Sequence, residues 1–195
     1  MGELHVNMNI TLDGVIQANG GPTEQDAGFE YAGWETPFWD AEGGEQVNAD
    51  VQASDALLLG RTTYDIFRAY WPGKTDEIGR AFDRVPKYVA SRGTPELSWD
   101  TSTQITDVGV EVRALRERHE QIHTWGSANL LQTLFREALV DQLNLWVHPV
   151  VIGQGKRLFP EGTVPTRFQQ VEPPKTFSGG RCCCVTGASR APRRR

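Results

Sequence analysis

Three short segments of the sequence combine glycine, hydroxyl and arginine side chains at points where an apolar run stops. They are Gly60-Arg61-Thr62-Thr63, Ser91-Arg92 and Gly126-Ser127-Ala128-Asn129-Leu130. The first and the third are each followed by a helical pattern. The start of a helix offers unpaired backbone N–H groups and the positive end of its dipole, and glycine lets a phosphate approach the backbone closely. These segments therefore predict a pocket for a phosphorylated ligand, with a dinucleotide as the candidate.

A fourth segment points to a different chemistry. Residues 119–123 read His-Glu-Gln-Ile-His, which matches the His-Glu-x-x-His pattern of zinc proteases. That pattern binds zinc only on a continuous helix, where the two histidines share one face. Residues 122–125 are predicted as a strand instead, so we expect no metal site, and zinc hydrolysis through His119 and His123 is the distant alternative.

The elements that must position these turns alternate along the chain between apolar runs and helical patterns. This alternation favours an α/β fold, with a mixed, mostly parallel central sheet flanked by helices. The predicted strands are Leu4–Leu12, Ala56–Leu59, Tyr88–Ser91, Ile122–Trp125 and Leu143–Ile152. The predicted helices are Glu42–Ser54, Thr63–Tyr70, Asp76–Arg84, Val110–Arg118 and Ala128–Val140. All three turns then lie at carboxyl ends of strands, where ligands bind in open α/β sheets.

Length and charge narrow the classes of partner. A chain of 195 residues suits one domain that buries its core without disulfides or a metal. A net charge of −5 and scattered basic residues argue against nucleic acid as a partner. The sequence has no apolar run of membrane-spanning length and no signal-peptide pattern, so we expect a cytoplasmic protein that binds a small molecule and no membrane.

Carboxylic acids near the predicted turns are candidates for a proton donor. Asp13, Glu35 and Asp40 are considered, and the last two lie in the aromatic-rich segment 29–40, which has neither helical nor strand periodicity. We expect that segment to form a loop over the site, or to pack its aromatic side chains under a long surface loop. Asp13 precedes a glycine in a typical turn pattern, and we prefer Asp40 as the catalytic residue.

Four motifs in order make the sequence resemble the dihydrofolate reductase-like family, in particular the C-terminal reductase domain of the bifunctional riboflavin biosynthesis deaminase-reductases. They are Thr11-Leu12-Asp13-Gly14-Val15-Ile16, Leu59-Gly60-Arg61-Thr62-Thr63-Tyr64, Trp125-Gly126-Ser127-Ala128, and the Pro-x-x-x-Gly-x-Gly-x-x-Leu-Phe pattern within residues 148–159. The resemblance spans residues 4–180, and we take residues 1–180 as one reductase-like domain.

The resemblance implies a stand-alone NADPH-dependent reductase that needs no metal and forms a homodimer. Its pattern assigns the cofactor's phosphates to Gly60, Arg61, Thr62 and Thr63, the adenosine 2′-phosphate to Ser91 and Arg92, the pyrophosphate to Gly126, Ser127, Ala128, Asn129 and Leu130, and the border of the nicotinamide to Ile16 and the glycines after it.

The implied reaction is hydride transfer to a small heterocyclic or carbonyl-like substrate, as in 5-amino-6-(5-phosphoribosylamino)uracil reductase and dihydrofolate reductase. The chain lacks the zinc-binding motifs of the deaminase half that accompanies this reductase in the bifunctional enzymes. The substrate is therefore left open. A catalytically silent nucleotide-binding protein on the same fold is the alternative.

Residues 181–195 form an atypical tail. Cys182–Cys184 are consecutive, which suits neither a disulfide framework nor a metal site. The segment Arg-Cys-Cys-Cys-Val-Thr-Gly can be encoded so that the reading frame one base earlier gives Ala-Val-Leu-Leu-Arg-Tyr-Gly, the pattern of an amphipathic strand. We hypothesise a frameshift after Gly180, and a genuine cysteine-rich strand is the alternative. In both cases we expect Cys182–Val185 to pair as a strand and the residues beyond Ala191 to be mobile.

Overall fold

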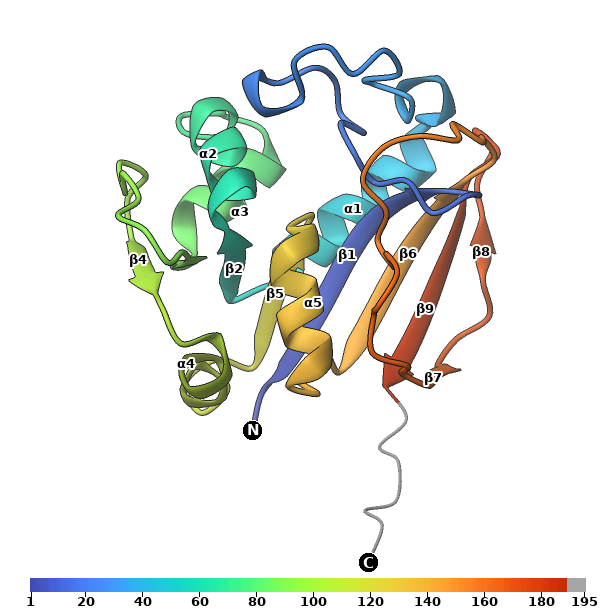
Figure 1. The fold of residues 1–195 in the computed structure, drawn as a ribbon. Helices are drawn as coiled ribbons and strands as arrows, with labels where there is room; N and C mark the ends of the chain where they lie inside the picture. The colour runs from blue at the N-terminus through green and yellow to red at the C-terminus, as the bar shows by residue number, and fades with distance from the viewer. Residues whose placement is uncertain (189–195) are drawn as a thin grey trace, which may run out of the picture.

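The computed structural model describes residues 1–188 and shows one mixed sheet with helices on both faces (Figure 1). The strands are β1 (Glu3–Thr11), β2 (Ala56–Gly60), β3 (Lys87–Ala90), β4 (Ser102–Ile105), β5 (Gln121–Trp125), β6 (Gln142–His148), β7 (Phe168–Gln170), β8 (Lys175–Thr176) and β9 (Cys182–Ala188). The helices are α1 (Ala41–Ala53), α2 (Arg61–Tyr70), α3 (Glu77–Arg84), α4 (Val108–Leu115) and α5 (Ala128–Arg136), with short 3-10 helices at Glu24–Asp26 and Thr36–Phe38.

The strand order is β4-β3-β2-β5-β1-β6-β9-β7, and β8 also pairs with β9. Strands β4, β3, β2, β5, β1 and β6 run parallel to one another, whereas β9 runs antiparallel to β6 and to β7. The predicted α/β fold with a mixed, mostly parallel sheet is therefore confirmed. Parallel strands place their carboxyl ends at one edge, which is where the predicted turns meet.

The two faces of strand β1 differ in chemistry, because successive side chains of a strand point to opposite faces. Leu4, Val6, Met8 and Ile10 belong to the main apolar core, together with buried residues of α4 and α5. The alternate residues His5, Asn7, Asn9 and Thr11 are polar and lie on the other face. The α1 and α3 side of the sheet has its own apolar cluster, which includes Val51 of α1 and Phe82 of α3.

Most element boundaries agree with the sequence predictions to within two residues. Helix α4 ends at Leu115, three residues before the predicted Arg118, and the larger differences in α5 and β6 have local causes. Helix α5 ends at Arg136 instead of Val140, because Ala138 adopts a positive φ of 50° that a helix cannot contain. Strand β6 ends at His148, directly before Pro149, which cannot donate a ladder hydrogen bond. Strands β4, β7 and β8 were not predicted, since each is short and has little apolar character.

The first part of the tail forms a strand within the sheet. Cys182 to Gly187 pair with β6, as expected for Cys182–Val185. Cys183 is buried against Trp146 and Phe177. The expectation of mobility beyond Ala191 falls outside the described residues. Among residues 1–188, no helix is both long and apolar enough to cross a membrane.

Candidate active site

A cleft of about 1990 Å³ opens where the parallel strands end. All the residues that the sequence assigned to cofactor binding line this cleft: Ile16, Gly60, Arg61, Thr62, Thr63, Ser91, Arg92, Gly126, Ser127, Ala128, Asn129 and Leu130. They meet because β3, β2 and β5 are adjacent in the sheet and each ends in one of the three turns. The aromatic-rich loop also reaches the cleft, through Glu35, Thr36 and Trp39.

The turns after β2 and β5 are joined into one unit by a serine hydroxyl. Ser127 Oγ accepts a hydrogen bond from the backbone N–H of Gly60 at 2.9 Å and donates one to Thr63 Oγ1 at 2.9 Å. A Cβ at Gly60 would lie 3.2 Å from Ser127 Oγ, and a Cβ at Gly126 would lie 3.2 Å from Thr63 Oγ1. Gly126 and Ser127 both have left-handed backbone conformations, with φ of 64° and 66°. The two glycines therefore permit the turns to pack directly against each other.

Helices α2 and α5 begin at this joined turn and have no side-chain cap within the described chain. Their N-cap residues are Gly60 and Ser127. The first N–H groups of a helix have no intrahelical partner, and together with the helix dipole they attract an anion. Two such starts on neighbouring strands make a suitable place for the phosphates of a dinucleotide.

Two arginines flank the same turns but differ in their partners. Arg61 Nε donates to Asp65 Oδ2 at 2.6 Å, and its Nη1 donates to the backbone oxygen of Thr94 at 3.4 Å. Arg92 is exposed and forms no ion pair with the residues that the structure describes. Both arginines are among the residues that line the cleft. Arg61 is held in position by its carboxylate neighbour, whereas Arg92 is available to an incoming anion.

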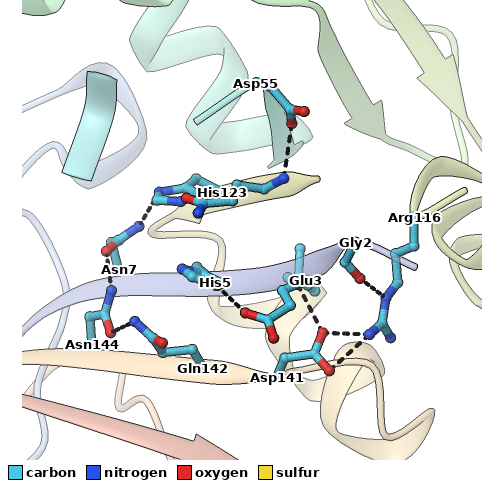
Figure 2. A network of polar contacts seen from close by, with 12 residues as sticks. Gly2, Glu3, His5, Asn7, Asp55, Arg116, His123, Asp141, Gln142 and Asn144 are labelled. Atoms are coloured by element: carbon cyan, nitrogen blue, oxygen red, sulfur yellow. Dashed lines mark hydrogen bonds and ion pairs between the residues drawn. The ribbon is translucent and has the colours of Figure 1, made fainter. Parts of the chain in front are cut away.

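The polar face of β1 supplies part of the cleft. Asn7 is 1% exposed, and its side-chain nitrogen donates to His123 Nδ1 at 3.2 Å while its oxygen accepts from Asn144 at 2.9 Å (Figure 2). Burial, helped by the neighbouring His5, lowers the pKa of His123 to about 3, so the imidazole is neutral and accepts at Nδ1. This network fixes the orientation of an amide that lines the cleft.

The three candidate carboxylic acids have three different environments. Asp13 accepts from Thr11 Oγ1 and from the N–H groups of Ile152 and Gly153, and these contacts lower its pKa to about 2. It is the turn residue that its sequence suggested. Glu35 lines the cleft and is 7% exposed, and burial raises its pKa.

Asp40 is placed differently from its expected role. Its carboxylate caps α1 by accepting from the N–H of Gly43 at 2.7 Å, and it also accepts from the N–H of Gly179 at 2.8 Å. These two hydrogen bonds lower its pKa, and Asp40 is not among the residues that line the cleft. A carboxylate held in its charged form is a poor proton donor, so Glu35 is a better candidate for that role than Asp40.

Several cleft residues were missed by the sequence reasoning. Asn7, Asn9, Trp146 and Arg181 line the cleft but had not been assigned to it. The signal for the asparagines was available, because a central strand covered on both faces normally carries apolar residues on both. Polar residues at alternate positions of a predicted central strand indicate a site on that face.

The two histidines of the zinc-protease pattern make hydrogen bonds to other side chains. His123 lies on strand β5, and His119 precedes that strand, so the helix that the pattern requires is not formed. His119 Nε2 and the Tyr88 hydroxyl are 2.9 Å apart, and His123 accepts from Asn7. No group of three or more His, Cys, Asp or Glu side chains within residues 1–188 is arranged to hold a metal ion. Zinc hydrolysis through this pair is therefore not supported.

Comparison with known proteins places the chain in a family. It is 28% identical to the uncharacterized protein YyaP of Bacillus subtilis over 186 residues, which cover 90% of this chain and 89% of YyaP. A pyrimidine reductase-like protein of Corynebacterium diphtheriae has a similar structure, with a TM-score of 0.68 at 13% identity over 97% of this chain and 93% of the other.

Dihydrofolate reductase of Enterococcus faecalis, solved in complex with NADP(H), also shares the fold. Its TM-score is 0.63 at 14% identity, over 96% of each chain. These two structural likenesses establish the dihydrofolate reductase-like fold. Residues 3–179 match the RibD C-terminal domain. The resemblance read from the four sequence motifs is thus confirmed, and the chain belongs to the RibD C-terminal domain family.

Proposed function

We propose that the chain is an NADPH-dependent reductase that transfers a hydride to a small heterocyclic or carbonyl-like substrate. The observation that carries the proposal is the pair of uncapped helix starts at α2 and α5, joined through Ser127 and flanked by Arg61 and Arg92. Binding pockets for small molecules usually have volumes of roughly 300–1000 Å³. A cleft of about 1990 Å³ has room for a dinucleotide and a second small molecule.

Different residues are expected to bind the phosphates and the reacting rings, at the two ends of the cleft. The helix starts bind phosphates, and the two arginines favour the additional phosphate of NADPH through charge-assisted hydrogen bonds. A bound reduced nicotinamide supplies the hydride. Ile16, Gly20 and Gly21 line the cleft on the loop after β1 and would border that ring. Asn7, held by His123 and Asn144, lies in the wall of the same cleft.

The proton that accompanies the hydride is assigned to Glu35. Its carboxyl group is buried, lines the cleft and accepts from Asn19 Nδ2 at 2.8 Å. Because burial raises its pKa, Glu35 keeps its proton to a higher pH than an exposed glutamate does. Turnover should then fall as the pH rises through this raised pKa, since the donor must be protonated.

Titration calorimetry with NADPH and NADH tests the proposal directly. We expect NADPH to bind more tightly than NADH, and a screen of candidate oxidants to find one that causes loss of NADPH absorbance. NADPH binding without turnover of any substrate would support the catalytically silent alternative. Failure of NADPH to bind at millimolar concentrations would refute the proposed function.

The choice of proton donor has its own test. Glu35→Gln removes the acid while keeping the shape of the side chain, so we expect kcat to fall about a hundredfold and the fall in turnover at high pH to disappear. Asp40→Asn keeps an N-cap side chain, and we expect nearly unchanged turnover. The opposite result in the two variants would return the donor role to Asp40.

Two further expectations stay predictions. The family resemblance implies a homodimer, which light scattering of the purified protein can check. We also expect the protein to act in the cytoplasm, where NADPH is supplied, and fractionation of the source cells can check this.

A further inference from the structure

A buried histidine at the end of β6 contacts both the sheet and the aromatic-rich loop at the cleft. His148 is 0% exposed, and its Nε2 lies 3.0 Å from Oδ1 of Asn9, a residue of β1 that lines the cleft. The imidazole also packs edge to face against Trp34, with ring centres 5.2 Å apart, and against Phe38, at 5.6 Å. One side chain therefore connects β1 to the loop that contains Glu35.

The protonation state of His148 sets the direction of its hydrogen bond to Asn9. Burial lowers the pKa of His148 to about 4, so the imidazole is neutral and has a single N–H. Its Nδ1 is buried and has no partner among the described residues. Buried N–H groups without an acceptor are rarer than buried acceptors without a donor. We therefore assign the proton to Nε2, which donates to Oδ1 of Asn9.

This hydrogen bond leaves the amino group of Asn9 for a ligand. Because His148 holds the oxygen of the amide, the amide keeps one orientation, and its nitrogen retains two N–H groups. Asn9 Nδ2 is not buried and makes no hydrogen bond with the residues that the structure describes. Asn9 therefore offers the cleft a hydrogen-bond donor whose orientation is fixed from behind.

The neighbouring part of the cleft suits a planar ring. Asn7, two residues before Asn9 on the same face of β1, is paired in register with Trp125 of β5. Trp125 lines the cleft together with Phe67 and Trp71, and all three aromatic side chains are only half-buried. Aromatic side chains that line a concave site pack against ligand rings offset or edge to face. The Asn9 donor thus lies next to an aromatic wall.

We propose that Asn9 binds the substrate by donating a hydrogen bond to an acceptor on a planar ring, a carbonyl oxygen or a ring nitrogen, and that His148 is the residue that positions this amide. The inference rests on the proposed function only in identifying the bound ring compound as the substrate. His148 also contacts Trp34 and Phe38, on either side of Glu35, so the same imidazole supports the loop of the proposed proton donor.

Quinoline and indole test the preference for an acceptor. Both are uncharged bicyclic aromatic compounds at pH 8, but the ring nitrogen of quinoline can only accept a hydrogen bond and that of indole can only donate one. Each is titrated by calorimetry into the protein, with and without saturating NADPH. We expect quinoline to bind about tenfold more tightly than indole, because indole leaves the Asn9 donor unpaired.

Variants of the amide and of the histidine should change this preference in different ways. Asn9→Asp replaces the donor by an acceptor of nearly the same shape, so indole should then bind more tightly than quinoline. His148→Phe keeps a ring against Trp34 and Phe38 but frees the amide to turn, so the two affinities should differ by about threefold or less. His148→Gln keeps a side-chain N–H and should restore part of the preference for quinoline.

His119→Phe is the matched control for the histidine variants. Like His148, His119 makes a side-chain hydrogen bond, to the Tyr88 hydroxyl, and is not part of the cleft wall. This variant should keep the preference of the original protein for quinoline. Urea unfolding checks that every variant folds.

The outcomes separate this inference from the proposed function. A preference for quinoline that depends on Asn9 and His148, in a protein that does not bind NADPH, would keep the amide site and reject the reductase. NADPH binding with equal affinities for the two probes, or with tighter binding of indole, would overturn the amide site alone. No measurable binding of either probe, or a preference that Asn9→Asp or His148→Phe leaves unchanged, would also overturn it.

Discussion

The five α-helices of the described chain begin in two different ways. At α1, α3 and α4 an aspartate side chain accepts a backbone N–H of the first turn, whereas α2 and α5 begin at Gly60 and Ser127 without such a cap. Both uncapped starts line the cleft. The start of α4 lines the cleft as well, but the Asp107 side chain already accepts a hydrogen bond from the N–H of Val110 there.

This difference distinguishes helix starts that contribute to stability from helix starts that are left for a ligand. A capping side chain satisfies N–H groups within the protein and stabilises the helix. An uncapped start forgoes that gain but leaves the same groups for an anionic ligand. The capped helices should therefore respond to mutation mainly in stability, and the uncapped helices mainly in NADPH affinity.

The largest effect is expected from a negative charge in the first turn of α2. Thr62→Glu places a carboxylate where a phosphate of the cofactor is proposed to bind, so NADPH affinity should fall a hundredfold or more, at least about 2.7 kcal/mol. Stability should not fall, because an acidic residue suits a helix start. Titration calorimetry and urea unfolding measure the two quantities.

Thr62→Gln is the matched control for this variant, because it adds a similar volume without the charge. It should weaken NADPH binding by much less than Thr62→Glu. If both variants bound NADPH as tightly as the original protein, the start of α2 would not be a phosphate site.

Arg61→Ala should have the next largest effect. Losing one charged hydrogen-bonding partner costs about 1.5–3 kcal/mol, so we expect roughly ten- to a hundredfold weaker NADPH binding and nearly unchanged NADH binding. Titration of both cofactors decides the matter. Equal losses for NADPH and NADH, or no loss, would show that Arg61 does not contact the 2′-phosphate.

Arg92→Ala sharpens that result. Arg61 is already paired with Asp65, whereas Arg92 forms no ion pair within residues 1–188. If Arg92→Ala loses NADPH affinity and Arg61→Ala does not, the selectivity lies at the end of β3 and not at the start of α2.

A smaller effect, on stability alone, is expected at a capped helix. Asp76 accepts from the N–H of Gly79 at 2.9 Å and does not line the cleft. Asp76→Ala should lower the free energy of unfolding by about 0.5–2 kcal/mol and leave NADPH binding unchanged. A change in NADPH affinity comparable to that of Arg61→Ala would contradict the division between capped and uncapped helices.

Removal of metal should have no effect. The proposed cleft chemistry uses helix starts and arginines, and we expect purified protein to contain no stoichiometric zinc and to keep its activity with chelators. One tightly bound zinc per chain, lost on replacing His119 or His123, would show that the protein has a functional site outside the capped and uncapped helix starts.

The sequence predicted the turns well because their signals are local. A glycine at the end of an apolar run and a helix pattern after it involve only neighbouring residues. The same local reasoning could not identify the role of Asp40, since its second hydrogen-bond partner, Gly179, is 139 residues away. Nor could it find Arg181, which reaches the cleft only because β9 pairs with β6.

The tail illustrates a question that the fold leaves open. Strand β9 forms with its cysteines in place, so pairing does not distinguish the two reading frames. The frameshift after Gly180 stays a hypothesis, and the end of the family match at residue 179 is consistent with it. Resequencing the gene tests this hypothesis. A clear read that encodes the present sequence, shared by close relatives, would reject the frameshift.

The sequence by itself determined the α/β class, the family and the residues of the three turns that line the cleft, because periodicity, glycines and motif spacing are properties of short segments. Only the tertiary structure decided which carboxyl group lies in the cleft, which arginine is already paired and which histidine holds the amide of Asn9. These properties depend on burial and on contacts between distant segments, and such contacts exist only once the sheet has assembled.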